Sequence, residues 1–211
     1  MDAQMDSQAD HDSMAMPQLI LASASPRRRA LLMQLALPFT VIPANIEEQQ
    51  LPNELPLVYV TRMAESKAAH LARQYPEALV LGADTIVVLD NDILGKPANI
   101  AAARHMLGRL SNRQHTVITG LALLRQRQQL SRLDTVSTLV RFRPLLPTEI
   151  EYYIATGEPF DKAGAYAIQG GAATFVASLH GCYTNVVGLP LRRTAALLRS
   201  AGVRIPYEDG A

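Results

Sequence analysis

Three arginines, Arg27 to Arg29, follow Pro26 in the stretch SASPRRR, where a helix is expected to begin. The first turn of a helix carries unpaired backbone N–H groups and the positive end of the helix dipole, so cations are disfavoured there. Ser25 suits the capping position and Pro26 the first helical position. Such a helix start binds anions, and a polyphosphate would make the arginines bidentate partners of its oxygens. The stretch therefore predicts a phosphate site, although solvated surface arginines explain the tripeptide equally well.

Asp84 lies within the apolar stretch LVLGADTIVVL, which has the composition of a buried strand. A carboxylate is costly to bury alone, so Asp84 must reach solvent at a bend after Gly82 or meet a cation or a metal. We favour a functional position over a structural salt bridge. Lys96, in GKP, follows a chain reversal that can return it to the same end of the sheet. Lys67 and Glu48, each taken alone, have the pattern of ordinary surface charges.

A glycine-rich segment at residues 158–190 is the third candidate region. Gly164, Gly170 and Gly171, with small residues between them, predict a flexible or sharply turning loop that carries Lys162 and Gln169. Such a loop allows the backbone to approach a ligand closely. The Gln169 side chain offers both a donor and an acceptor, as reading the edge of a base requires, although an ordinary loop amide has the same pattern.

The composition excludes several classes of protein. With 211 residues, 48% of them hydrophobic, the chain can bury one sizeable core. The formal net charge is +1 and the charges are interspersed, so no basic face favours nucleic acid or a membrane surface. Aromatic residues make up 5%, which argues against stacking on single-stranded nucleic acid, and no apolar run is long enough to span a membrane. The single cysteine, Cys182, fits a reducing cytoplasm.

Alternating strand and helix patterns predict one α/β domain over residues 17–205, between a disordered tail at 1–16 and a short tail at 206–211. Long hairpin-forming runs favour a mixed, elongated sheet flanked by helices. Asn99 is the expected N-cap of one helix, and Thr148 with Glu151 the expected capping box of another. Strands are expected at 18–23 and 39–44, within 77–97, and at 115–125 and 133–144; helices are expected at 26–36, 56–74, 99–110, 149–156 and 189–200.

Seven short motifs occur in order along the chain: SASPRR, NIEE, ESKA, GADTIV, GKP, DKAGAYAIQG and NVVGLPL. Together they resemble the Maf family of nucleoside triphosphate pyrophosphatases, over about residues 18–200. The resemblance implies an α/β fold with two lobes around a cleft, related to that of the inosine triphosphate pyrophosphatases. The last two motifs are similar to the branch that acts on dTTP and UTP rather than to the one that acts on 7-methyl-GTP.

The resemblance implies a cytoplasmic house-cleaning enzyme that hydrolyses dTTP and UTP to the monophosphate and pyrophosphate, with modified pyrimidine nucleotides as further candidates. It also implies a homodimer and a divalent cation, Mg²⁺ or Mn²⁺, held by Glu48 and Asp84. Asp84 would accept the proton. Arg27, Thr85 and Gln169 would govern substrate choice. The full set of residues expected to bind substrate is Ser23, Ser25, Arg27, Arg28, Lys67, Thr85, Lys96, Lys162 and Gln169.

Two other functions are open from the sequence. The same cleft could sense nucleotides in a regulator of cell division and septum formation that acts through a partner. It could also belong to a purine pyrophosphatase for ITP or XTP, whose pocket near Gln169 would differ. Pyrophosphate release separates the sensor from the enzymes, since a pure sensor binds nucleotide without turning it over.

Overall fold

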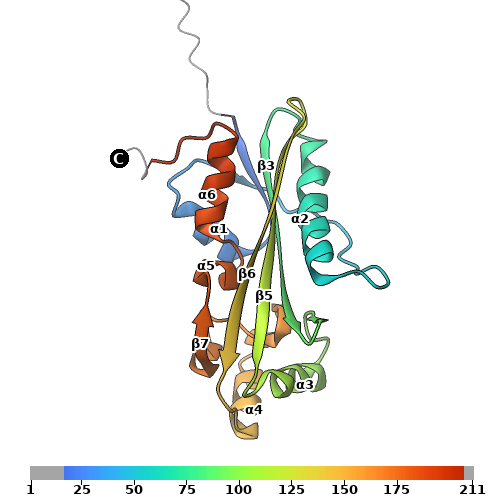
Figure 1. Cartoon of the computed structure of the whole chain (residues 1–211), viewed down its shortest axis with the longest axis vertical. Helices are drawn as coiled ribbons and strands as arrows, with labels where there is room; N and C mark the ends of the chain where they lie inside the picture. Colours follow the sequence, from blue (N-terminus) through green and yellow to red (C-terminus); the bar gives the residue numbers. More distant parts are fainter. Residues whose placement is uncertain (1–16, 207–211) are drawn as a thin grey trace, which may run out of the picture.

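The computed structural model of the chain describes residues 17–206, which build a seven-stranded sheet with helices on both faces (Figure 1). The expected tails at 1–16 and 206–211 lie outside the described residues, apart from Pro206. In chain order the elements are β1 (Leu19–Ala22), α1 (Pro26–Met33), β2 (Thr40–Val41), α2 (Pro56–Ala72), β3 (Leu79–Leu89), β4 (Asp92–Leu94), α3 (Ile100–Leu110), β5 (Gln114–Arg125), β6 (Leu130–Phe142), α4 (Pro147–Ala155), the 3-10 turns η1 (Glu158–Asp161), η2 (Ala163–Ala165) and η3 (Gly171–Phe175), β7 (Val176–His180), α5 (Tyr183–Val187) and α6 (Leu191–Ser200).

The sheet is mixed, with the strand order β2-β1-β3-β5-β6-β7 and β4 paired to β3 beside this path. β1 runs parallel to both β2 and β3, whereas the pairs from β3 through β5 and β6 to β7 are antiparallel. The hairpin of β5 and β6, with strands of 12 and 13 residues, runs along the long axis of the molecule (Figure 1). The expected elongated mixed sheet is therefore confirmed.

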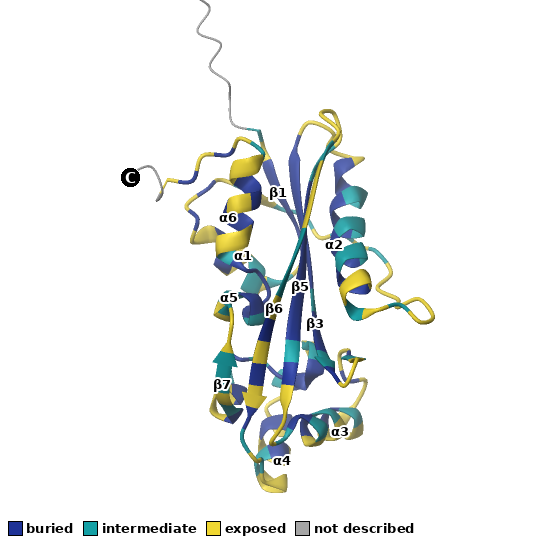
Figure 2. Ribbon diagram, viewed as in Figure 1, coloured by how far each residue is buried: buried dark blue, intermediate teal, exposed yellow. Residues whose placement is uncertain are grey.

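Helices cover the two faces of the sheet unequally. α2 lies on one face, where Ile20 and Val80 pack with Ala68 in a small core. The next side chains along the strands, Leu21 and Leu81, point to the other face and join a larger core with α1 and with α3 to α6. Buried residues accordingly run along the central strands and the inner side of α2 (Figure 2).

Two glycines bring α2 close to the sheet. A Cβ atom at Gly82 would lie 2.2 Å from a backbone carbonyl oxygen of α2, and one at Gly120 would lie 2.5 Å from another. Both distances are far below van der Waals contact, so a side chain at either position would push the helix outward. Lys67 lies on the buried side of α2, and Asp84 follows Gly82 on the same face of β3. The close packing therefore brings the Lys67 side chain within reach of Asp84.

The helix caps divide into two correct predictions and one error. Ser25 and Asn99 each accept a hydrogen bond from a backbone N–H of the helix that follows, at 3.4 Å and 2.9 Å. The capping box of Thr148 and Glu151 was wrong. The helix begins at Pro147, whose ring suits the first helical position, so the carboxylate in place to bond the N-cap N–H belongs to Glu149 and accepts it at 2.8 Å.

The glycine-rich segment 158–190 is folded rather than an extended flexible loop. It contains the turns η1 to η3, the edge strand β7 beside β6, and the short helix α5. The strand was missed because its sequence, VASLH, is short and has a mixed burial pattern. The sharp turns expected from the glycines are present: Gly164 has φ of 68°, in the left-handed region that glycine tolerates.

Candidate functional site

A gap in the pairing of β3 opens a cleft in the middle of the molecule. β3 pairs with β1 up to Gly82 and with β4 from Val87 onward, so residues 83–86 pair with no described strand on this edge. On the opposite edge they keep an unbroken register with β5. β1 ends beside the gap, and the chain turns there into α1. The cleft at this position has a volume of about 510 Å³.

All eleven residues predicted for the site line this cleft. They come from the β1–α1 turn, the first turn of α1, the segment after β2, helix α2, strand β3, the segment after β4, and the region of η1 to η3. The folding of the chain therefore joins motifs that are far apart in the sequence. The set is Ser23, Ser25, Arg27, Arg28, Glu48, Lys67, Asp84, Thr85, Lys96, Lys162 and Gln169.

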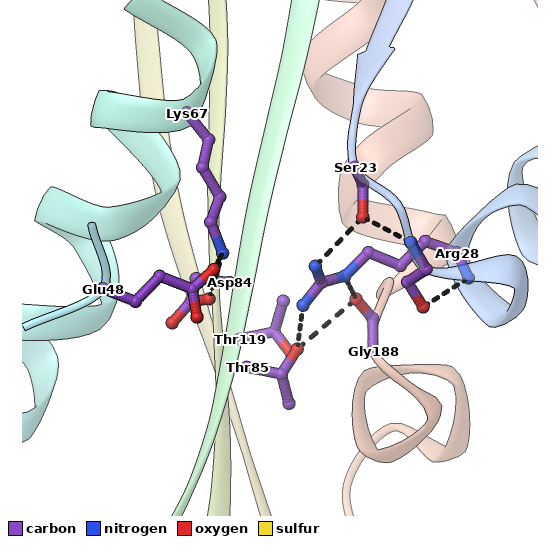
Figure 3. A network of polar contacts seen from close by, with 9 residues as sticks. Ser23, Arg28, Glu48, Lys67, Asp84, Thr85, Thr119 and Gly188 are labelled. Atoms are coloured by element: carbon purple, nitrogen blue, oxygen red, sulfur yellow. Dashed lines mark hydrogen bonds and ion pairs between the residues drawn. The ribbon is translucent and has the colours of Figure 1, made fainter. Parts of the chain in front are cut away.

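Lys67 connects the two carboxylates of the cleft. Its Nζ atom lies 2.7 Å from Oδ1 of Asp84 and 2.6 Å from Oε1 of Glu48 (Figure 3). Lys67 and Asp84 are buried, with 6% and 7% of their surface exposed. Burial alone would raise the pKa of Glu48, but the hydrogen bond from Lys67 and nearby positive charges hold that pKa below its usual value. Of the three environments that the sequence allowed for Asp84, the structure has a cation, Lys67.

Arg28 is the centre of a second polar network, on the other side of β3 (Figure 3). Its Nε atom donates to the Gly188 carbonyl oxygen at 2.8 Å. The two terminal nitrogens donate to the hydroxyls of Thr85, at 3.0 Å, and Ser23, at 3.3 Å. The Thr119 hydroxyl lies 2.9 Å from that of Thr85. Burial lowers the pKa of Arg28, although a guanidinium starts from so high a value that it stays charged in proteins.

The arginine triplet is therefore divided among three environments. Arg28 turns inward and ties α1 to Thr85 and Gly188. Arg27 lines the cleft, with Nη1 at 3.8 Å from the Asp161 carboxylate of η1. Arg29 is exposed. Arg29 thus has the surface position of a solvated charge, whereas Arg27 and Arg28 face the cleft, where the phosphate interpretation stays a prediction.

Three further predicted residues, Lys96, Lys162 and Gln169, line the cleft. Lys96 follows β4 and is exposed, and its charge contributes to lowering the pKa of Glu48. Lys162 forms an ion pair with the neighbouring Asp161. Gln169 is exposed in the turn before η3. These side chains add two positive charges and one amide to the lining of the cleft, and Asp161 pairs with both Lys162 and Arg27.

The sequence did not single out Thr119 or Asn185, which hydrogen-bond to the residues around Arg28. The Thr119 hydroxyl donates to the backbone oxygen of Asn185 at 3.1 Å. The buried Asn185 amide donates to the Val117 carbonyl oxygen at 3.0 Å and to the Thr138 hydroxyl at 2.9 Å. A buried amide held by the sheet in this way fixes α5 and the Gly188 backbone beside Arg28. Asn185 is the first residue of the motif NVVGLPL, so the motif was the sequence signal that could have identified it.

The carboxylates offer part of a metal site. Among residues 17–206, no group of three or more histidine, cysteine, aspartate or glutamate side chains is arranged to hold a metal. Glu48 and Asp84 do converge on one point, now at the Lys67 ammonium. Two carboxylates supply hard oxygen ligands, and Mg²⁺ commonly binds through one or two carboxylates together with substrate phosphates. The donor set therefore fits a metal that arrives with a polyphosphate.

The fold and the cleft define an α/β protein with a central cleft, in which two carboxylates lie among arginine and lysine side chains. The chain belongs to the Maf-like protein family, whose model matches residues 18–201. The family resemblance of the seven motifs is thereby confirmed. No helix in the described part of the chain, residues 17–206, is long and apolar enough to cross a membrane.

Several relatives are similar over nearly their whole length. A dTTP/UTP pyrophosphatase of Symbiobacterium thermophilum is 52% identical over 196 residues, covering 93% of this chain and 100% of the relative. Those of Anaeromyxobacter dehalogenans (strain 2CP-C) and Moorella thermoacetica are 51% and 50% identical, covering 92% and 90% of this chain and 98% of each relative. Among solved structures, the Staphylococcus aureus Ham1 protein matches with a TM-score of 0.50 at 10% identity, over 87% of this chain and 99% of that one. This last likeness concerns the fold alone.

Proposed function

We propose that this protein is a nucleoside triphosphate pyrophosphatase that hydrolyses dTTP and UTP to the monophosphate and pyrophosphate. The relatives that carry this activity in their names are about half identical to the chain over nearly its full length. The observation that carries the proposal is the pairing of buried Asp84 with Lys67 at 2.7 Å inside a cleft lined by further cations. A carboxylate next to bound phosphate is what activation of a water molecule requires.

In the proposed reaction, Asp84 accepts a proton from the water that attacks the α-phosphorus, and pyrophosphate leaves. Without substrate, the Lys67 ammonium pairs with both Asp84 and Glu48 and offsets one of their two negative charges. An entering triphosphate competes for this ammonium and draws it toward the phosphate oxygens, which leaves the Asp84 carboxylate able to act as the base. Arg27, Lys96 and the other cleft cations stabilise negative charge on the phosphates, since electrostatics and positioning provide most of phosphoryl transfer catalysis.

Glu48 and Asp84 are the residues that we propose to hold Mg²⁺ or Mn²⁺. When bound, the ion supplies neutralisation of charge on the triphosphate. Arg28 takes a different part, because its guanidinium already bonds Thr85 and Gly188. It holds the helix start of α1, where Ser25 and the backbone N–H groups bind phosphate, in register with β3. A homodimer and a cytoplasmic location remain predictions of the family resemblance.

The test is pyrophosphate release from dTTP, UTP, CTP, GTP, 7-methyl-GTP and ITP, with Mg²⁺, with Mn²⁺ and with neither. We expect metal-dependent release from dTTP and UTP that falls at least about a hundredfold in Asp84→Asn, the scale of a lost general base. Asp90→Asn is the matched control, because Asp90 follows the same strand but is exposed. Nucleotide binding without release would refute the hydrolase and favour the nucleotide sensor. Preference for ITP would favour the purine pyrophosphatase, and a near-normal rate in Asp84→Asn would refute the base assignment.

A further inference from the structure

The turn that carries Gln169 is hydrogen-bonded to Tyr153 and Glu158, two residues that do not line the cleft. The backbone N–H of Gly170 donates to the carbonyl oxygen of Ala167 at 3.0 Å, which closes a turn with Ile168 and Gln169 at its centre. Ile168 is buried in the core, whereas Gln169 is exposed and lines the cleft. The turn therefore presents one side chain to the core and the next to the ligand side.

Tyr153 and Glu158 hold both ends of this turn. The buried Tyr153 hydroxyl accepts the N–H of Ala167 at 3.1 Å and donates to Oε1 of Glu158 at 3.0 Å. The other carboxylate oxygen of Glu158 accepts the N–H of Gly171 at 3.2 Å. A phenol and a carboxylate thus bond the backbone immediately before and after the segment 168–170.

The glycines of the turn are fitted to this pair. A Cβ atom at Gly170 would lie 1.9 Å from Oε1 of Glu158, and one at Gly171 would lie 3.3 Å from the Tyr153 ring. The Tyr153 ring itself packs edge-on against Phe175, with 5.2 Å between ring centroids. Burial raises the pKa of Tyr153, so its hydroxyl keeps its proton and remains a donor to Glu158. The turn therefore rests on a tyrosine hydroxyl that stays protonated and on a carboxylate that accepts from it.

Base discrimination requires such support, because a carboxamide is nearly symmetric. Rotation by half a turn exchanges the oxygen and the NH₂ group of Gln169. One orientation matches thymine or uracil, which present a carbonyl acceptor at the position where cytosine presents an amino donor, and the other orientation matches cytosine. A freely moving Gln169 would therefore accept both kinds of pyrimidine. Selection between them begins with a backbone that fixes where the Gln169 amide meets the base, so that the two amide orientations differ in the hydrogen bonds they make.

We propose that Tyr153 and Glu158 are positioning residues for Gln169, and that through the turn at 167–170 they set the preference for dTTP and UTP over dCTP. This inference rests on the proposed function for its substrates. The geometric part, that the pair orders the turn, stands independently of catalysis.

The main variant is Tyr153→Phe, which keeps the ring against Phe175 and removes the hydroxyl. Losing one such hydrogen bond corresponds to about 3- to 10-fold in an equilibrium. We expect the ratio of kcat/KM for dTTP to kcat/KM for dCTP to fall by about that factor, with KM for dTTP raised and kcat within about twofold. Glu158→Gln, a second and milder variant, is expected to shift the ratio in the same direction. Tyr152→Phe is the control, since Tyr152 is 78% exposed on the same helix and should leave the ratio unchanged.

Two further measurements separate positioning from a general loss of structure. In a Gln169→Ala background, Tyr153→Phe should leave the ratio unchanged, because the group through which it acts is gone. Amide hydrogen exchange of the segment 163–171 should speed up at least about threefold in Tyr153→Phe but not in Tyr152→Phe. Unchanged exchange, or a selectivity loss that persists in Gln169→Ala, would overturn the inference. Wild type that releases no pyrophosphate while Tyr153→Phe loosens the turn would refute the proposed function and leave the positioning role supported.

Discussion

Replacing Lys67 by methionine tests the central charge arrangement, because methionine keeps most of the side-chain volume and removes the charge. The Asp84 and Glu48 oxygens both contact Nζ, so they lie no more than about 5.3 Å apart. Two unit charges at that distance repel by about 3 kcal/mol at an effective dielectric constant of about 20. Breaking a buried ion pair from one side costs a similar amount, about 3 to 5 kcal/mol. We expect Lys67→Met to lower the free energy of unfolding by about 3 to 5 kcal/mol.

The two contacts of Lys67 should contribute unequally. The Asp84 side chain is 10% exposed, whereas the Glu48 side chain is 44% exposed and can turn toward water. Solvent screening should therefore limit the cost of Glu48→Gln to about 1 kcal/mol or less. In the Lys67→Met background, Asp84→Asn should restore more than half of the lost stability, because it removes the uncompensated charge.

Urea unfolding followed by far-ultraviolet circular dichroism measures these free energies, and the chain has no tryptophan to serve as a fluorescent probe. A cost below about 1 kcal/mol for Lys67→Met would refute the reasoning, since it would mean that water screens Asp84 despite its burial. A double variant no more stable than Lys67→Met would refute it in another way. The loss would then come from packing of the lysine stem rather than from charge.

Two further predictions concern packing and pH. Gly82→Ala should destabilise the protein by about 3 kcal/mol, because the new Cβ would meet a backbone oxygen of α2. Gly95→Ala, which has open space around it, should change the unfolding temperature little. Equal effects of the two substitutions would contradict the close-packing argument. Burial lowers the pKa of His115 to about 4 from an unfolded value of about 6.5, so its contribution to stability is complete above pH 6.5 and declines by about 3 kcal/mol as the pH falls to 4. In urea titrations, His115→Gln should lose this part of the pH dependence; an unchanged slope would show that other groups cause it.

The sequence was informative where a residue conflicts with its surroundings. Asp84 stands out because a carboxylate in an apolar strand needs a partner, and the structure supplies Lys67. Ser25 before Pro26 marked a helix start for the same local reason, since capping depends on neighbours in the chain. Placing both in one cleft required the order of the motifs, because no local pattern states which strands become neighbours.

The parts that were missed depend on contacts between distant segments. Thr119 is an ordinary strand residue until it faces Thr85, 34 positions away. Tyr153 and Glu158 look like surface residues of a helix end, and their role depends on where the turn at 167–170 folds back. β7 is short and gains its strand structure from the edge of β6. Such features follow from tertiary packing, which overrides weak local preferences.

The unbroken pairing of β3 with β5 across the cleft has a mechanical consequence. The parts of the molecule on the two sides of the cleft are built on the same strands, β3, β5 and β6. A continuous sheet therefore joins them instead of a flexible linker. Widening the cleft means bending a hydrogen-bonded ribbon along its length, which resists deformation more than a loop does. The distance between the Lys67 and Arg28 side chains is therefore set mainly by folding, and the width of the cleft is fixed before a ligand binds.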